Sequence, residues 1–202
     1  NMHSKISDRF YLCNIGIDIN EVLKAPELKL KGKSLVFTGV MDYEPNEDAM
    51  VYFIQEVFDK VAEKCPEVTL YIVGKNPTDK LKKLVINRKN IIVTGKVDSV
   101  FSYIKSSTIY ISPLRIGSGK KNKIIEAISC GTPLIASTVS MEGFEDIEDK
   151  NLILRADSSN EWVENICKLL SDEEKRIDIK KRMFNLLDES YSWKNIAKKL
   201  VE

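Results

Sequence analysis

The sequence predicts an α/β fold, in which helices cover both faces of a doubly wound, Rossmann-like parallel sheet. Apolar runs such as Leu35–Phe37 and Leu70–Val73 are continuous rather than alternating, which is typical of strands buried on both faces. Longer segments with helical spacing separate these runs, so the order strand then helix repeats about five times. Ligands of such sheets bind beyond the carboxyl ends of the strands, and we expect the functional residues there.

Each predicted strand is a short apolar run bounded by residues that favour turns. The helical segments between the runs require right-handed crossovers, which make neighbouring strands parallel. We expect strands at Phe10–Ile15, Ser34–Gly39, Val68–Val73, Asn90–Thr94, Thr108–Ser112, Pro133–Ala136 and Leu152–Leu154.

The first long helix is predicted to begin after Pro45, with Asn46 as its N-cap and Glu47 and Asp48 in its first turn. Apolar residues then follow at three- and four-residue spacing as far as position 61. Further helices are expected at Asp79–Arg88, Asp98–Ser106, Gly119–Cys130, Ser159–Leu170, Asp172–Leu187 and Trp193–Val201. Gly131 is expected to end the fourth of these seven helices, with Pro133 shortly beyond.

The composition excludes several classes of function. The chain has 31 basic and 30 acidic residues, a near-balance that argues against general nucleic-acid binding. Hydrophobic residues make up 43% of the chain, which favours a folded core over disorder. His3 is the one histidine, so a Ser-His-Asp triad, a two-histidine metal site and a histidine general base are all excluded.

The cysteines and apolar runs indicate a cytoplasmic protein. Cysteines at positions 13, 65, 130 and 167 form no CxxC pair, and a disulfide framework is not expected at this size. Runs such as Ile91–Val93 are far too short to span a membrane, and no signal peptide opens the chain. Peripheral association with the inner face of the membrane is compatible with the sequence but not required by it. Without a linker rich in Gly, Ser or Pro, residues 1–202 are expected to form one domain, with 1–9 as a disordered or linker segment.

A candidate anion site lies in the segment SPLRIGSGKKNKIIEAISCGTPLIA, residues 112–136. A strand ends, a loop with two glycines follows, and a helix begins; such glycines admit a ligand close to the backbone, and free helix amides favour an anion. The pattern predicts a phosphate or diphosphate site, with Glu126 placed to bind hydroxyls of the same ligand. A solvated helix start with ordinary surface lysines is the alternative, and the pattern is neither a Walker motif nor GxGxxG. The cations of this segment are Arg115, Lys120, Lys121 and Lys123.

The stretch Glu126–Ala136 resembles the donor-binding signature of retaining glycosyltransferases of family 4, which have the two-domain GT-B fold. The resemblance implies that this chain is a single lobe of that fold, with a helical C-terminal tail and a crossover helix at about 190–202. It covers residues 10–202, and its further landmarks are Asn14–Asp18, Phe37–Asn46, Leu70–Gly74, Ile91–Val97, Met141–Phe144 and Tyr191–Trp193.

The chain departs from the family pattern at three places. Ser118 stands where the family has a first Glu that often contacts the donor sugar, so the identity of the sugar is open. Val40 and approximately Pro45 stand where many members have an Arg and a Lys facing the diphosphate. The positive charge that stabilises the leaving diphosphate is therefore expected from the cations of the anion site, with Lys123 as the first candidate.

The resemblance implies roles for individual residues. Lys123 and Glu126 are expected to be catalytic, with Glu126 on the ribose hydroxyls and the amides of Gly119–Asn122 on the diphosphate. No metal or other cofactor is expected, because lysines and helix amides can replace a cation. The further donor-binding residues are Gly39, Gly74, Lys75, Lys96, Val97, Arg115, Gly117, Ser118, Gly119, Lys120, Lys121 and Asn122.

The sequence therefore predicts the donor-binding half of a retaining glycosyltransferase. Its partners would be a nucleotide-sugar and an N-terminal acceptor-binding domain, and no nucleic acid. A GT-B-like nucleotide-sugar epimerase or phosphorylase domain and a non-catalytic nucleotide-binding module are the alternatives. Five acids within residues 142–149 are expected to form a solvated loop, with an acceptor-side or inter-domain contact as the alternative.

Overall fold

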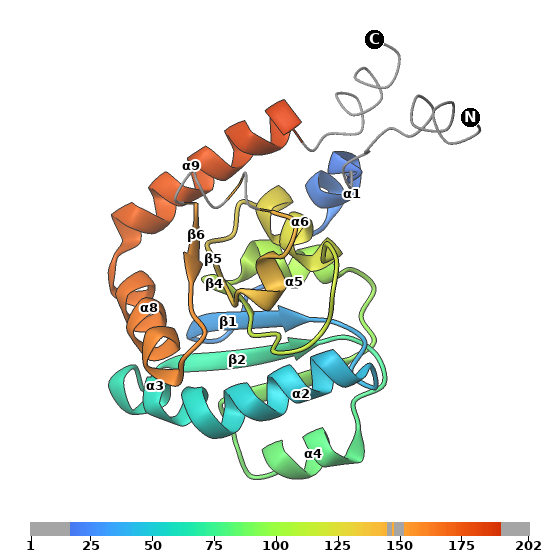
Figure 1. The fold of residues 1–202 in the computed structure, drawn as a ribbon, viewed down its shortest axis with the longest axis vertical. Helices are drawn as coiled ribbons and strands as arrows, with labels where there is room; N and C mark the ends of the chain where they lie inside the picture. Colours follow the sequence, from blue (N-terminus) through green and yellow to red (C-terminus); the bar gives the residue numbers. More distant parts are fainter. Residues whose placement is uncertain (1–16, 145–146, 148–151, 191–202) are drawn as a thin grey trace, which may run out of the picture.

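A computed structural model describes residues 17–144, 147 and 152–190. Among these, six parallel strands form one sheet in the order β3-β2-β1-β4-β5-β6 (Figure 1). This is the strand order of a doubly wound, Rossmann-like fold, so the predicted fold class is confirmed. The strands are β1 (Lys33–Thr38), β2 (Val68–Val73), β3 (Ile91–Gly95), β4 (Ile109–Ser112), β5 (Leu134–Ala136) and β6 (Ile153–Arg155).

Each of these six strands lies within one residue of its predicted position. The central strands β1, β2 and β4 are almost wholly buried, as their continuous apolar runs predicted. In the register of the central pair, Leu35 lies opposite Leu70 and Phe37 opposite Ile72. The predicted strand at Phe10–Ile15 lies outside the described residues.

Helices cover the two faces of the sheet. Figure 1 shows α2 and α3 on one side of β1 and β2, and α5 and α6 on the other. α8 packs against α3, while α9 packs against α6. The helices are α1 (Ile19–Lys24), α2 (Glu44–Tyr52), the π-helix η2 (Phe53–Phe58), α3 (Asp59–Lys64), α4 (Asp79–Val85), α5 (Val100–Ser106), α6 (Asn122–Ser129), the 3-10 helix η3 (Val139–Met141), α8 (Ser159–Ser171) and α9 (Glu173–Ser190).

The predicted cap of the first long helix is wrong. The helix α2 begins at Glu44, Pro45 stands in its first turn, and the residue at the N-cap position is Tyr43. Proline lacks an amide hydrogen and has a fixed φ, so it is favoured in a first turn and the helix begins before it. Asn46 thus lies inside the helix, where its side chain is buried.

The helix α6 begins three residues later than predicted. Gly119 has a φ of +74°, in the left-handed region, so it cannot be part of a right-handed helix. Gly119 and the two lysines after it therefore remain in the loop, and the first residue of α6 is Asn122. At the other end, Gly131 has a φ of +64° and ends the helix as predicted.

The core is continuous from α2 to α8. The segment from α2 to α3 is one helical run with a π-helical middle, and this middle buries Phe53 and Phe58. The ring of Phe53 meets the buried ring of Trp162 edge-on, with centroids 5.7 Å apart. Trp162 is therefore part of the core.

Within the described residues, no helix is long and apolar enough to cross a membrane. The predicted helix at Trp193–Val201, the segment 1–9 and most of the crossover segment 190–202 lie outside those residues, so they stay predictions.

A close approach of two backbones predicts the effect of a substitution at Gly74. A Cβ built there would lie 1.8 Å from the carbonyl oxygen of Gly39, and Gly74 has a φ of +144°. Gly95 has a similarly unusual φ of +69°, but a Cβ built there meets nothing within 4 Å. We expect Gly74→Ala to lower the free energy of unfolding by about 3 kcal/mol or more, and Gly95→Ala by only about 1–2 kcal/mol. Urea denaturation measures both, and equal losses would contradict the close approach.

Candidate functional site

A cleft of about 630 Å³ opens at the carboxyl ends of the central strands. It is formed by the loops after β1, β2, β3 and β4 and by the first turns of α6, which is where the doubly wound topology predicts a ligand. Its lining residues are Thr38, Gly39, Val40, Tyr43, Pro45, Asn46, Gly74, Lys75, Lys96, Val97, Val100, Leu114, Ile116, Gly117, Ser118, Lys120, Lys121, Asn122, Lys123 and Glu126. Twelve of the predicted site residues are in this set, and only Arg115 and Gly119 are outside it.

The loop after β1 is fixed against its neighbours by close contacts. The amide of Met41 donates to the carbonyl of Lys75 at 2.9 Å, which joins the loops after β1 and β2. A Cβ at Gly39 would lie 2.6 Å from Nδ2 of Asn46, so a larger residue there would displace that side chain. The glycines at 39 and 74 therefore allow the two loops and α2 to meet at the cleft.

Lys123 is held in the cleft by a side chain from the opposite wall. Its Nζ donates to Oδ1 of Asn46 at 2.7 Å, and Nδ2 of Asn46 donates to the carbonyl of Val40 at 3.0 Å. The ammonium also lies 4.1 Å from the centre of the Phe37 ring. Asn46 therefore connects the loop after β1 with α6.

Burial lowers the pKa of Lys123 to about 7, although Glu126 nearby favours the charged form. Burial likewise raises the pKa of Glu126, and Lys123 opposes that shift. Both groups line the cleft one turn apart on α6. A partly desolvated ammonium beside a carboxyl group can bind an anion and hydroxyl groups of one ligand.

The loop between β4 and α6 forms the third wall. Gly117, Ser118, Lys120 and Lys121 line the cleft, and Asn122 opens α6, so the free amides of the first turn lie at this wall. Gly119 does not line it; its amide donates to Oε2 of Glu142 at 2.8 Å. The structure thus brings together most of the predicted anion site around one cavity.

Arg115, in contrast, contacts other parts of the protein. Its Nε donates to Asp48 at 2.9 Å, and its guanidinium lies 4.7 Å from the centre of the Tyr52 ring. Both partners are on α2, and Arg115 does not line the cleft. The described residues hold no group of three His, Cys, Asp or Glu side chains placed to bind a metal ion.

Two residues of this region were missed as site residues by sequence reasoning. Asn46 ends the segment Phe37–Asn46, one landmark of the family resemblance, but the preference of Asn for helix caps led to its prediction as an N-cap. Glu142 was predicted to lie in a solvated acidic loop. In the structure it contacts the loop between β4 and α6 that carries Gly117 and Gly119, which we call the glycine loop. Neither contact is local in sequence, so no pattern around either residue indicates its partner.

Residues 32–172 match the family described as glycosyl transferases group 1. The chain is 32% identical over 140 residues to an uncharacterized glycosyltransferase of Methanocaldococcus jannaschii, covering 65% of this chain and 35% of that protein. It is 28% identical over 131 residues to the phosphatidyl-myo-inositol mannosyltransferase of Mycobacterium tuberculosis, covering 60% and 33%. The chain thus spans about a third of the length of these curated relatives.

The fold is shared with a solved structure. A crystal structure of a TarM mutant from S. aureus, in complex with UDP and other ligands, superposes with a TM-score of 0.76 at 18% identity. The superposition covers 98% of this chain and 41% of the other. At this level of identity the likeness establishes the fold.

The lowered pKa of Lys123 predicts how stability depends on pH. Between its pKa of about 7 in the folded chain and the ordinary value of 10.5, the unfolded chain keeps a proton that the folded chain has released. The free energy of unfolding of the wild type should therefore rise with pH in this window, and below about pH 7 the full cost of burying the charge remains. Relative to Lys123→Met, the rise should be about 1 kcal/mol per pH unit between about pH 7.5 and 9.5.

Urea denaturation at several pH values measures this slope. The exposed Lys82, which pairs with Asp79, supplies the control variant Lys82→Met, whose pH profile should run parallel to that of the wild type because Lys123 is retained. Parallel pH profiles for the wild type and Lys123→Met would show that the ammonium is not buried as described.

Proposed function

Because this chain belongs to the group 1 glycosyl transferase family, we propose that it is the donor-binding half of a retaining glycosyltransferase. The whole protein would transfer a sugar from a nucleoside diphosphate to a glycan or lipid-linked acceptor. One observation carries the proposal: a single cleft gathers Lys120, Lys121, Lys123, the start of α6 and Glu126. These groups match a ligand that carries both a diphosphate and hydroxyls.

The donor would lie across the carboxyl ends of the strands. Its diphosphate would meet the amides that end the glycine loop and the ammonium groups of the three lysines. Glu126 would accept hydrogen bonds from the ribose hydroxyls. The base would lie toward the loops after β2 and β3, against Gly74, Lys75, Lys96 and Val97, which line that part of the cleft. The UDP of the TarM complex makes UDP the first nucleotide to test.

The reaction itself would depend on charge. Departure of the nucleoside diphosphate builds negative charge at the leaving oxygen, and cations already in place stabilise it without reorganisation. Lys123 is the first candidate, because Asn46 fixes its Nζ at 2.7 Å inside the cleft. A neighbouring diphosphate would keep this lysine protonated at neutral pH. We propose that lysines and helix amides serve in place of a metal ion, and that an N-terminal domain supplies the acceptor site.

We expect the chain of 202 residues to bind UDP and to turn over no donor alone. Calorimetry with UDP, GDP and ADP measures the binding and identifies the base. Glu126→Ala should weaken the binding by about 10- to 100-fold, because charge-assisted hydrogen bonds to the ribose are lost. Glu67→Ala removes an exposed carboxylate at the opposite ends of the strands and serves as control. Absence of heat with all three nucleotides, or unchanged binding by Glu126→Ala, would refute the site.

A longer protein that carries this chain after an acceptor-binding domain tests the reaction. The product should keep the anomeric configuration of the donor, as read from the coupling constant of its anomeric proton. Excess EDTA should leave the rate unchanged. An inverted product would contradict the retaining mechanism, and loss of activity with EDTA would contradict the metal-independent step. Donor binding without turnover would instead favour a non-catalytic nucleotide-binding module.

A further inference from the structure

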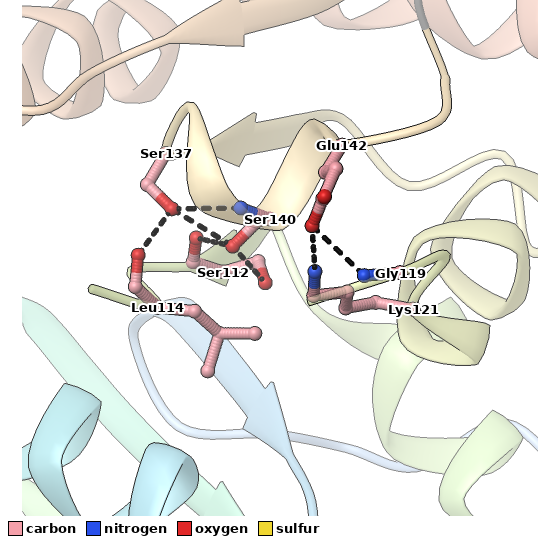
Figure 2. A network of polar contacts seen from close by, with 7 residues as sticks. All are labelled: Ser112, Leu114, Gly119, Lys121, Ser137, Ser140 and Glu142. Carbon is pink, nitrogen blue, oxygen red and sulfur yellow. Dashed lines mark hydrogen bonds and ion pairs between the residues drawn. The ribbon is translucent and has the colours of Figure 1, made fainter. Parts of the chain in front are cut away.

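The glycine loop is contacted from outside the cleft by the segment that follows β5. Oε2 of Glu142 accepts hydrogen bonds from the amide of Gly119 at 2.8 Å and from Nζ of Lys121 at 3.2 Å (Figure 2). The Lys121 side chain is only 9% exposed, whereas that of Glu142 is 53% exposed. A single carboxylate oxygen therefore holds two residues of the loop.

Gly143 and Phe144, the two residues after Glu142, contact Lys120, which lies between Gly119 and Lys121 in the loop. A Cβ built at Gly143 would lie 2.8 Å from Cγ of Lys120, so a glycine is needed for this approach. The ammonium of Lys120 lies 5.2 Å from the centre of the Phe144 ring, within range of a cation–π interaction. Three consecutive residues, 142–144, thus contact three consecutive residues of the loop, 119–121.

The segment is itself anchored by a buried serine network (Figure 2). The hydroxyl of Ser137 donates to the carbonyl of Leu114 at 2.5 Å, and the hydroxyl of Ser140 donates to the carbonyl of Ser112 at 2.6 Å. The amide of Ser140 donates to the Ser137 hydroxyl at 3.1 Å. Because all three serines are buried, these bonds fix η3, and with it Glu142, to the end of β4.

The side on which Glu142 binds decides its role. Glu142 and Gly119 do not line the cleft, whereas Ser118, Lys120, Lys121 and Asn122 do. The carboxylate thus binds the Gly119 amide outside the cleft, and it fixes Lys121, which lines the cleft, without lining the cleft itself. The loop needs such support, because Gly117 and Gly119 have φ values of +117° and +74° and a Cβ at either would meet nothing within 4 Å. Two glycines in open space give an unsupported loop many conformations.

We propose that Glu142 is a positioning residue that fixes the glycine loop in the conformation that receives the diphosphate. The inference rests on the proposed function and deepens it by assigning support of the diphosphate subsite to a residue that does not touch the ligand. Without Glu142 the loop would have to be ordered at the moment of binding, and that ordering would cost affinity.

Calorimetry with UDP and with uridine tests this role, because uridine lacks the diphosphate. Glu142→Ala should weaken UDP binding about tenfold and leave uridine binding unchanged, since only the diphosphate needs the ordered loop. Glu142→Gln keeps an acceptor for the Gly119 amide but loses the charge opposite Lys121, so an intermediate loss is expected. Glu67→Ala is the matched control, because Glu67 pairs with Lys33 at 3.0 Å and is 50% exposed, much like Glu142.

Hydrogen exchange of the Gly119 amide gives a second, ligand-independent measurement. The exchange should be at least about tenfold faster in Glu142→Ala than in the wild type, since the bond that protects it is removed. Wild-type affinity for UDP in either glutamate variant, or an equal loss of UDP and uridine binding, would overturn the positioning role alone. Tighter UDP binding would also overturn it and make the carboxylate a competitor of the diphosphate. Failure of the wild type to bind any nucleoside diphosphate would overturn the proposed function as well.

Discussion

The reversal of strand order between β1 and β4 is the constraint on which the rest of the molecule depends. The chain leaves β1 toward β2 and leaves β4 toward β5, on the other side. The helices that follow the two strands cover opposite faces of the sheet (Figure 1), so the loops after β1 and β4 separate where the strands end. The space between them is the cleft, and every wall of it is set by a strand end. The buried apolar strands thus fix the positions of polar groups that have no part in the core.

A partly desolvated cation is the second constraint. Removing the ammonium of Lys123 from water is unfavourable, and its lowered pKa expresses that cost. Asn46, the Phe37 ring and Glu126 offset part of it, and a diphosphate in the cleft would offset more. A group that destabilises the empty fold and is relieved by a ligand is typical of a binding site. Burial of apolar residues such as Leu35 and Ile72 in the sheet below the cleft also offsets this cost.

A feature of the fold or of the site could be predicted from the sequence where residues close to it in the chain determine it, and could not where distant residues do. The strands and the end of α6 at Gly131 depend on neighbouring residues, and their prediction was accurate. The start of α2 failed because Asn46 and Pro45 both carry helix-start signals, and the sequence does not decide between them. The side-chain partners failed for another reason: Asp48 reaches Arg115 across 67 positions, and Asn46 reaches Lys123 across 77. Such pairs depend on the sheet, which places the first turns of α2 beside the loop after β4 and the start of α6, and local periodicity does not contain that arrangement.

The central claim is that the glycine loop and the start of α6 bind the diphosphate of a nucleotide. Mapping of ¹H–¹⁵N chemical shifts during titration with UDP tests it most directly, because each backbone amide reports separately. We expect the largest shifts at Lys120, Lys121 and Asn122, with further shifts at Gly74 and Lys96 for the base. The amides of Lys33 and Val68, at the opposite ends of β1 and β2, should not move. Shifts confined to residues outside the cleft, or no shifts at saturating UDP, would contradict it.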